Sequence, residues 1–311
     1  MLRTAEVRST YFSLAGEGIM TKAYTKLEFH GVGVEWTERL EEDVLSHIDQ
    51  LSCFELIPEN FFFNRRRDFL KRLGKTNIPV LIHGVELSVG TDQPFKQKHF
   101  DAIREIADYV NTVNFSDHLS ITEAGGVEIG QLTPIPWSIE ACDAVCRNID
   151  AIQSQIQVPF LIENVANRFV FPETELRETE FINLVVKRTG CYLLLDLHNI
   201  HVNSHNFGYD PFEWVSEIDM DLVEGIHIAG GFYDEDGTLV DGHSSLAPDR
   251  VWDLYRYVCE RTLPSCTIVE WTENPPPFEI LMGDVERANS ILAETSRTPA
   301  YSTAVQEGAF R

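Results

Sequence analysis

Residues 190–206 read GCYLLLDLHNIHVNSHN, and they join a buried strand to a group of polar side chains. The apolar run from Cys191 to Leu195 predicts a strand that is buried on both faces, as in a parallel sheet. The polar residues that follow it are Asp196, His198, Asn199, His201 and His205. A strand that enters a hydrophobic core and ends in an acid and several histidines indicates a functional site at that end.

Seven other short apolar runs have a similar form, and helix-like stretches separate most of them. The eight runs begin at residues 31, 53, 79, 112, 159, 191, 225 and 266. Among the separating stretches, QKHFDAIREIADYV (97–110) places apolar residues on one helical face. TEFINLVVKRTG (179–190) ends in the basic residues and glycine that favour a helix C-terminus. This alternation predicts an α/β fold, a (β/α)8 TIM-type barrel, in preference to a doubly wound open sheet.

The barrel is expected to form a single domain over residues 29–295. We expect an N-terminal extension at 1–28 and a polar C-terminal tail at 296–311. The first twenty residues contain Glu6 and Glu17 and no apolar signal core, so we expect a cytoplasmic protein. No apolar run reaches the roughly 18 residues that a membrane span requires.

The composition limits the classes of partner. A formal net charge of −24 over 311 residues repels phosphate backbones and disfavours nucleic-acid binding. The six cysteines are scattered through a chain too large to need disulfide bonds. Cys142 and Cys146 lie one helical turn apart without a histidine nearby in the sequence, so we do not expect a cysteine metal site.

Polar side chains gather where the predicted strands end, and this edge carries the active site in barrels of this type. They are Glu55, Glu59 and Asn60 after the second run, His83 after the third, Asp117 and His118 after the fourth, Glu163 and Asn164 after the fifth, Asp196 to His201 after the sixth, His227 in the seventh and Glu270 in the eighth. One such residue alone is usually a satisfied core or loop group. The convergence of so many on one ring favours a functional pocket.

The residue types in this ring point to metal ions. Several carboxylates buried together are costly unless cations neutralise them. Imidazole and carboxylate groups without thiolates suit iron, manganese, zinc or a similar divalent ion. The candidate ligands are His83, His118, Glu163, Asp196, Asn199, His227, Asp241, His243 and Glu270. They exceed the roughly six that one octahedral ion takes, so we expect two or three ions that share a bridging carboxylate.

The other polar residues at these ends are expected to support the ligands or to contact the substrate. They are Glu59, Asn60, Asp117, Asn164 and His201. His198 is left out, because an extended backbone after Asp196 would turn its side chain away from the ligands. His47 and His99 are assigned to helix surfaces.

Eight motifs occur together in an order that resembles a known family. They are LIHGVELSVG (81–90), VNFSDHL (113–119), LTPIP (132–136), PFLIENVANRF (159–169), GCYLLLDLHNIHVN (190–203), GIHIAGG (225–231), DGHS (241–244) and IVEW (268–271). The set resembles the multinuclear non-haem iron-dependent oxidases, a family long catalogued as a domain of unknown function, which includes the methanobactin-biosynthesis oxidase.

The resemblance implies an enzyme of natural product biosynthesis with two or three irons in mixed Fe(II)/Fe(III) states. It implies that dioxygen is the co-substrate, that a residue of a ribosomally made precursor peptide is oxidised, commonly a cysteine, and that a small partner protein binds the leader. It further implies three iron positions. They are His83, His118 and Glu163 for one ion, Glu163, Asp196 and His227 for the second, and Asn199, Asp241, His243 and Glu270 for the third.

The chain departs from the family pattern in two places. Trp271 and Thr272 stand where many members carry an Arg-Asp pair, and Gly242 stands where a threonine is frequent. Neither departure removes a ligand, and Trp271 is expected to support the site or contact the substrate. The alternative function is a metal-dependent TIM-barrel hydrolase or isomerase of the xylose-isomerase type. A non-catalytic binding module would not need nine converging ligands.

Overall fold

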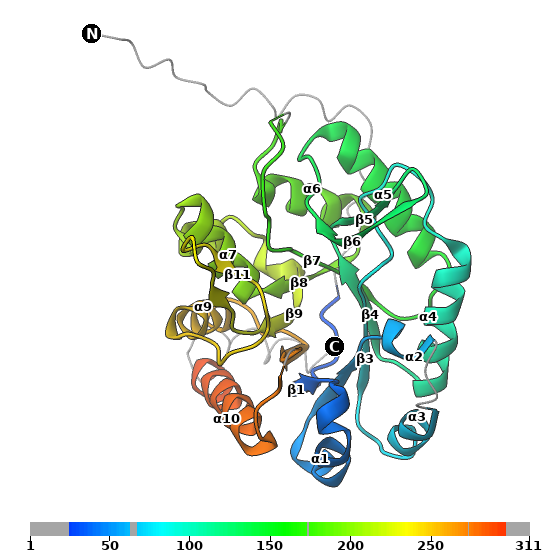
Figure 1. Ribbon diagram of the computed structural model, residues 1–311, viewed down its shortest axis with the longest axis vertical. Helices are drawn as coiled ribbons and strands as arrows, with labels where there is room; N and C mark the ends of the chain where they lie inside the picture. Colours follow the sequence, from blue (N-terminus) through cyan, green and yellow to red (C-terminus); the bar gives the residue numbers. More distant parts are fainter. Residues whose placement is uncertain (1–24, 63–66, 173, 273, 297–311) are drawn as a thin grey trace, which may run out of the picture.

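Eight parallel strands close into a barrel in the computed structural model, which describes residues 25–62, 67–172, 174–272 and 274–296. Their order around the barrel is β1-β12-β9-β8-β7-β4-β3-β2, and helices surround them (Figure 1). The barrel strands are β1 (Gly31–Glu35), β2 (Cys53–Leu56), β3 (Val80–Gly84), β4 (Asn114–His118), β7 (Phe160–Glu163), β8 (Tyr192–Asp196), β9 (Val223–Ile228) and β12 (Cys266–Val269). Each strand overlaps one of the eight predicted runs, so the predicted TIM-type barrel is confirmed.

The helices cover the outside of the barrel. They are α1 (Glu41–Ser46), α2 (Glu59–Phe62), α3 (Arg67–Leu73), α4 (Gln97–Val110), α5 (Ile139–Gln153), α6 (Glu178–Thr189), α7 (Leu197–Phe207), α8 (Pro211–Ser216), α9 (Asp249–Cys259) and α10 (Phe278–Thr295), with short 3-10 turns at Glu38–Leu40, Ile48–Gln50 and Met220–Leu222. Helix α4 buries Phe100, Ile103 and Ile106, which lie on its predicted apolar face. Gly190 ends α6 with a φ of +71°, a conformation that glycine adopts without strain.

Two short hairpins interrupt the alternation of strands and helices, and the sequence patterns did not predict them. Strands β5 (Ile121–Ala124) and β6 (Val127–Thr133) form one, and β10 (Phe232–Tyr233) and β11 (Leu239–Val240) form the other. They follow barrel strands β4 and β9, so both belong to the edge of the barrel at which the strands end.

Side chains two residues apart on a strand face the same side of a sheet, and this alternation organises the barrel interior. Cys53, Leu81, Cys266 and Ile268 form a small apolar cluster of their own in the interior. Two residues beyond Cys53, Leu81 and Ile268, the same face carries Glu55, His83 and Glu270 instead. This apolar cluster lies directly below the polar end of the barrel, and we call it the apolar floor.

An ion pair lies at the opposite end of the barrel. Lys26 lies 3.1 Å from Glu224, a buried residue at the start of β9, and its ammonium group also donates to Thr262. The expected extension at 1–28 and tail at 296–311 lie largely outside the described residues. None of the described helices is both long and apolar enough to cross a bilayer.

Gly33 provides a test of how closely β1 and β2 approach. A Cβ atom at this position would lie 2.0 Å from the carbonyl oxygen of Cys53 on β2, so the strands would have to separate. We expect Gly33→Ala to lower the free energy of unfolding in urea by about 3 kcal/mol. The matched control is Gly283→Ala in α10, where a Cβ meets nothing within 4 Å and alanine should stabilise the helix by up to ~1 kcal/mol. Equal effects of the two changes would contradict the packing argument.

Candidate metal centre

Every barrel strand delivers one ionisable side chain to the same end of the barrel. In chain order these residues are Glu35, Glu55, His83, His118, Glu163, Asp196, His227 and Glu270, and all are buried. Asp241 and His243 join them from the loop between β11 and α9. His243 has a φ of +42°, a left-handed conformation that is strained for a residue with a side chain and is often found at functional sites.

His83, His118 and Glu163 form the first group of side chains in this ring. The Nε2 atoms of His83 and His118 lie 3.2 and 3.4 Å from Oε2 of Glu163. The other nitrogen of His83 is 2.9 Å from the Ser116 hydroxyl, which in turn donates to the carbonyl of Ile82. Ser116 therefore accepts the Nδ1–H of His83 and leaves the Nε2 lone pair directed at Glu163.

Glu163 also faces a second group, which contains Asp196 and His227. The three ligand atoms lie within 4.8 Å of one another. One carboxylate oxygen of Asp196 caps α7 by accepting from the backbone N–H of Asn199, and the other has no hydrogen-bond partner. Asn164 holds the backbone of Asp196 through two hydrogen bonds, which fixes the direction of this carboxylate.

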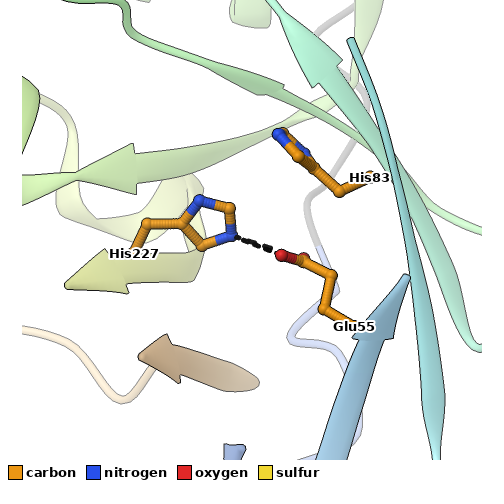
Figure 2. Close-up of side chains that lie close together, drawn as sticks. All are labelled: Glu55, His83 and His227. Atoms are coloured by element: carbon orange, nitrogen blue, oxygen red, sulfur yellow. Dashed lines mark hydrogen bonds and ion pairs between the residues drawn. The ribbon is translucent and has the colours of Figure 1, made fainter. Parts of the chain in front are cut away.

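His227 is held between carboxylates on both sides of its ring. Figure 2 shows Glu55 of β2 directed at His227, with His83 beside them, and the Nε2 atom is 3.1 Å from Oε1 of Glu55. The Nδ1 atom lies 2.9 Å from Glu270 and 3.6 Å from Glu163. Donation from Nε2 to Glu55 leaves the Nδ1 lone pair free for an ion, an arrangement that outer carboxylates commonly impose on metal-bound histidines.

Asp241, His243 and Glu270 meet at the third part of the ring. Nε2 of His243 lies 2.9 Å from Oδ1 of Asp241, and its Nδ1 lies 3.7 Å from Oε2 of Glu270. The amide nitrogen of Asn199 donates to the carbonyl of Asn164, while its amide oxygen has no partner. The structure thus brings all nine sequence-predicted ligand positions to one ring.

Several donor atoms of this ring approach one another without forming hydrogen bonds, although His227 is hydrogen-bonded to Glu55. Buried atoms without a hydrogen-bond partner are found on Glu35, Glu55, His118, Glu163, Asp196, Asn199, His227, Asp241, His243 and Glu270. Distances near 3 Å between such atoms match the spacing of adjacent ligands on an octahedral ion with bonds of about 2.1 Å. In the described part of the chain, the ion pairs of these carboxylates are with imidazoles and with no lysine or arginine. The donor set therefore fits divalent metal ions.

The buried carboxylates of the ring repel one another strongly. Burial, and then the neighbouring carboxylate of Glu163, raises the pKa of Asp196 well above its usual value. Burial also raises the pKa of Glu35 well above its usual value, and the neighbouring carboxylate of Glu270 is the second cause. Burial alone would raise the pKa of Asp241, but His243 holds it at about 2. Without metal, the ring must share protons among its acids, and bound cations would replace those protons.

Two of the residues expected to support the site, Asp117 and Glu59, hold the loop that follows β3. Asp117 accepts hydrogen bonds from the backbone of His118 and Leu87 and thereby holds the loop after β3. Glu59 accepts from the backbone of Val85 in the same loop and contacts His99. His99, assigned to a helix surface from the sequence, is therefore partly buried against Glu59, and that assignment is wrong.

Three further residues complete the comparison with the sequence. Trp271 packs in the main hydrophobic core, and His201 lies on α7 with its ring centroid 6.3 Å from that of His198. His198 was left out on the assumption of extended backbone, but α7 begins at Leu197, so this assumption is wrong. Its ring is fully buried and its Nε2 lies 3.6 Å from Asp241, on the border of the ring.

Sequence reasoning missed Glu35, and it placed Glu55 at the ring without assigning it a role. Glu35 is the last residue of β1 and Glu55 is the last but one of β2, and each lies two residues beyond an inward-facing position, Gly33 or Cys53. The same spacing of two links Leu81 to His83 and thus provides a signal that could have marked both acids as inward-facing.

Two cavities border the ring from different sectors of the barrel. One of about 390 Å³ is lined by residues after β1, β2 and β12, including Glu35, Asn60 and Thr272. The other, of about 690 Å³, is lined by α7 and the β10–β11 hairpin and reaches Asp241. A larger cavity of about 750 Å³ lies against α2, α3 and α4 and contains none of the ring residues.

The family model described as "RiPP precursor modification enzyme MbnB/TglH/ChrH" matches residues 31–293. The chain belongs to this family. It is 34% identical to a UPF0276 protein of Vibrio parahaemolyticus over 82% of this chain and 89% of that protein. It is 28% identical to a UPF0276 protein of Acaryochloris marina over 93% of this chain and 98% of that one. Membership supports an enzyme that acts on a precursor peptide.

Solved structures of other families share the barrel. Endonuclease IV from Thermus thermophilus superimposes with a TM-score of 0.56 at 15% identity, covering 85% of this chain and 99% of that one. The 3-keto-D-glucoside 4-epimerase YcjR from E. coli gives a TM-score of 0.52 at 13% identity, covering 85% and 100%. At these identities the likeness shows the fold alone.

Glu163 is the most informative residue to change, because it faces both the first and the second group of side chains. With Fe(II) as the probe for a divalent ion, we expect Glu163→Gln to weaken metal binding by at least about tenfold, measured by anaerobic titration and elemental analysis. The circular dichroism spectrum of the metal-free protein should be unchanged. Glu286→Gln, an exposed change of the same kind on α10, is the matched control. Wild-type iron binding by Glu163→Gln would contradict the arrangement of ligands.

Proposed function

We propose that the chain is a multinuclear non-haem iron-dependent oxidase that uses dioxygen to modify a cysteine of a ribosomally synthesised precursor peptide. The observation that carries the proposal is the ring of buried imidazoles and carboxylates whose unpartnered atoms face one another. Membership of a family of precursor-modifying enzymes supports the peptide as substrate. The coarser conclusion, an enzyme of that family with a candidate metal centre, does not depend on iron.

We assign the ring residues to three iron positions. The first is held by His83, His118 and Glu163, the second by Glu163, Asp196 and His227, and the third by Asn199, Asp241, His243 and Glu270. Close approaches of His83 and His118 to one oxygen of Glu163, and of His227 to the other, support Glu163 as the bridge. Bound iron would supply the one-electron and dioxygen chemistry.

The protein's own residues hold this centre in register. Ser116 and Glu55 each fix one nitrogen of a histidine, so that the other nitrogen points into the ring. Asn164 fixes the backbone that carries Asp196. Orienting contacts of this kind raise metal affinity and limit movement of the ligands during turnover.

An extended substrate suits the approaches to the ring. The two bordering cavities allow a peptide segment to reach the centre from more than one side. The net charge of −24 disfavours a nucleic-acid substrate despite the barrel shared with an endonuclease. We also propose a small partner protein that binds the peptide leader.

The second candidate is a metal-dependent TIM-barrel hydrolase or isomerase. It is favoured by the donor set itself, because zinc and manganese accept the same imidazole and carboxylate ligands. Such an enzyme would need neither iron nor dioxygen, so metal content and oxygen dependence separate the two candidates.

Metal content is the first test. Protein purified without chelators from iron-supplied cells is expected to carry about two or three iron ions per chain, because the ring offers more ligands than one octahedral ion uses. Elemental analysis measures this directly. A single zinc ion with no affinity for iron would exclude the oxidase.

Oxygen dependence is the second test. Co-expression with a neighbouring precursor gene and its small partner should change the mass of the precursor, through loss of hydrogens or addition of oxygen, as dioxygen accepts the electrons. Purified components should give the same change in air and none under strict anaerobiosis, as read by mass spectrometry. Equal turnover without oxygen would favour the hydrolase or isomerase.

A further inference from the structure

Glu35 is a buried acid at the end of β1 that none of the proposed iron positions uses. Its side chain is only 4% exposed, and its Oε2 atom has no hydrogen-bond partner. β1 pairs with β2 on one side and β12 on the other, so Glu35 lies between Glu55 and Glu270 on the ring. Three acids are thus adjacent along one arc of the barrel.

The carboxylate of Glu35 converges with His243 and Glu270. One ligand atom from each residue lies within 4.8 Å of the other two. Each of the three residues also carries a buried atom without a hydrogen-bond partner. No lysine or arginine among the described residues forms an ion pair with these acids. Two carboxylates held together without a cation would repel strongly in this buried setting.

We propose that Glu35 is a further ligand of the ion assigned to His243 and Glu270. The inference rests on the proposed metal centre and enlarges it by one oxygen donor. An imidazole with several carboxylates suits a divalent ion such as Fe(II), and the added negative charge strengthens its attraction.

The surroundings of Glu35 give this ion a route to solvent. Glu35 and Thr272 both line the cavity of about 390 Å³ that opens beside the ring. The Thr272 hydroxyl is 3.3 Å from Nδ1 of His243, so the same cavity wall reaches the second member of the group. An ion or a substrate could therefore reach the centre through this cavity, next to Glu35.

The competing explanation is that Glu35 is a neutral acid that only fills space and donates a hydrogen bond to Glu270. Glu35→Gln separates the two roles, because glutamine has the same shape and keeps a donor but is a poor metal ligand. A neutral structural acid would leave iron binding unchanged in this variant, whereas the loss of a ligand would weaken it. Glu35→Asp keeps the carboxylate on a shorter side chain and serves as the conservative variant.

The experiment loads wild type, Glu35→Gln, Glu35→Asp and the control Glu286→Gln with Fe(II) alone under anaerobic conditions. Iron content after dialysis and the Fe(II)-induced rise in melting temperature are both measured. Glu35→Gln is expected to bind its weakest iron at least about tenfold more weakly and to show a smaller rise. Without metal, it should melt no lower than wild type, because a buried repulsion has been removed. Glu35→Asp should recover part of the lost iron.

Three outcomes overturn the inference in different ways. Wild-type iron content and wild-type stabilisation in Glu35→Gln would show that Glu35 is not a ligand while leaving the proposed function intact. A wild-type protein that takes up no Fe(II) would overturn both the proposed function and this inference. Metal-free melting of Glu35→Gln well below wild type would assign Glu35 a structural role and also contradict the proposal.

Discussion

Mutual repulsion among buried acids is the constraint on which the site end of this barrel depends. Six carboxylates and four imidazoles share one ring, and the described lysines and arginines do not pair with them. Such a group is stable only when protons or metal ions neutralise it. The barrel resists this repulsion, because eight of these ten side chains are carried at the ends of barrel strands that are hydrogen-bonded on both sides, and only Asp241 and His243 come from a loop. Metal ions bound in the ring would therefore also stabilise the fold.

The sequence predicted the barrel because its strands are buried on both faces and read as continuous apolar runs. Helix ends such as Gly190 were also readable, since a residue with positive φ at a helix terminus favours glycine. The start of α7 was harder to recognise. Asp196 both ends a strand and caps the following helix, and this double role turned His198 toward the ring rather than away from it.

Side chains that meet from distant strands were only partly predictable. His83 and Glu163 were expected at one edge because parallel strands end together. Glu35 was missed because a single acid after a short apolar run has many ordinary explanations, and only the spacing of two within the barrel marks it as inward-facing. The hairpins beside the ring gave no periodic signal, since each of β10 and β11 spans only two residues.

Two buried cysteines lie beneath the ring, and their protonation determines whether they could bind its metal ions. Cys53 precedes Glu55 by two residues, and Cys266 lies beside it in the apolar floor of the barrel. Burial, and then the neighbouring thiol, raises the pKa of Cys53 well above its usual value, and burial, and then Glu55, raises the pKa of Cys266 to about 12. Protonated thiols are poor nucleophiles and poor ligands. A metal centre above this floor would meet Cys53 and Cys266 as protonated thiols, so a thiolate ligand would have to come from another molecule.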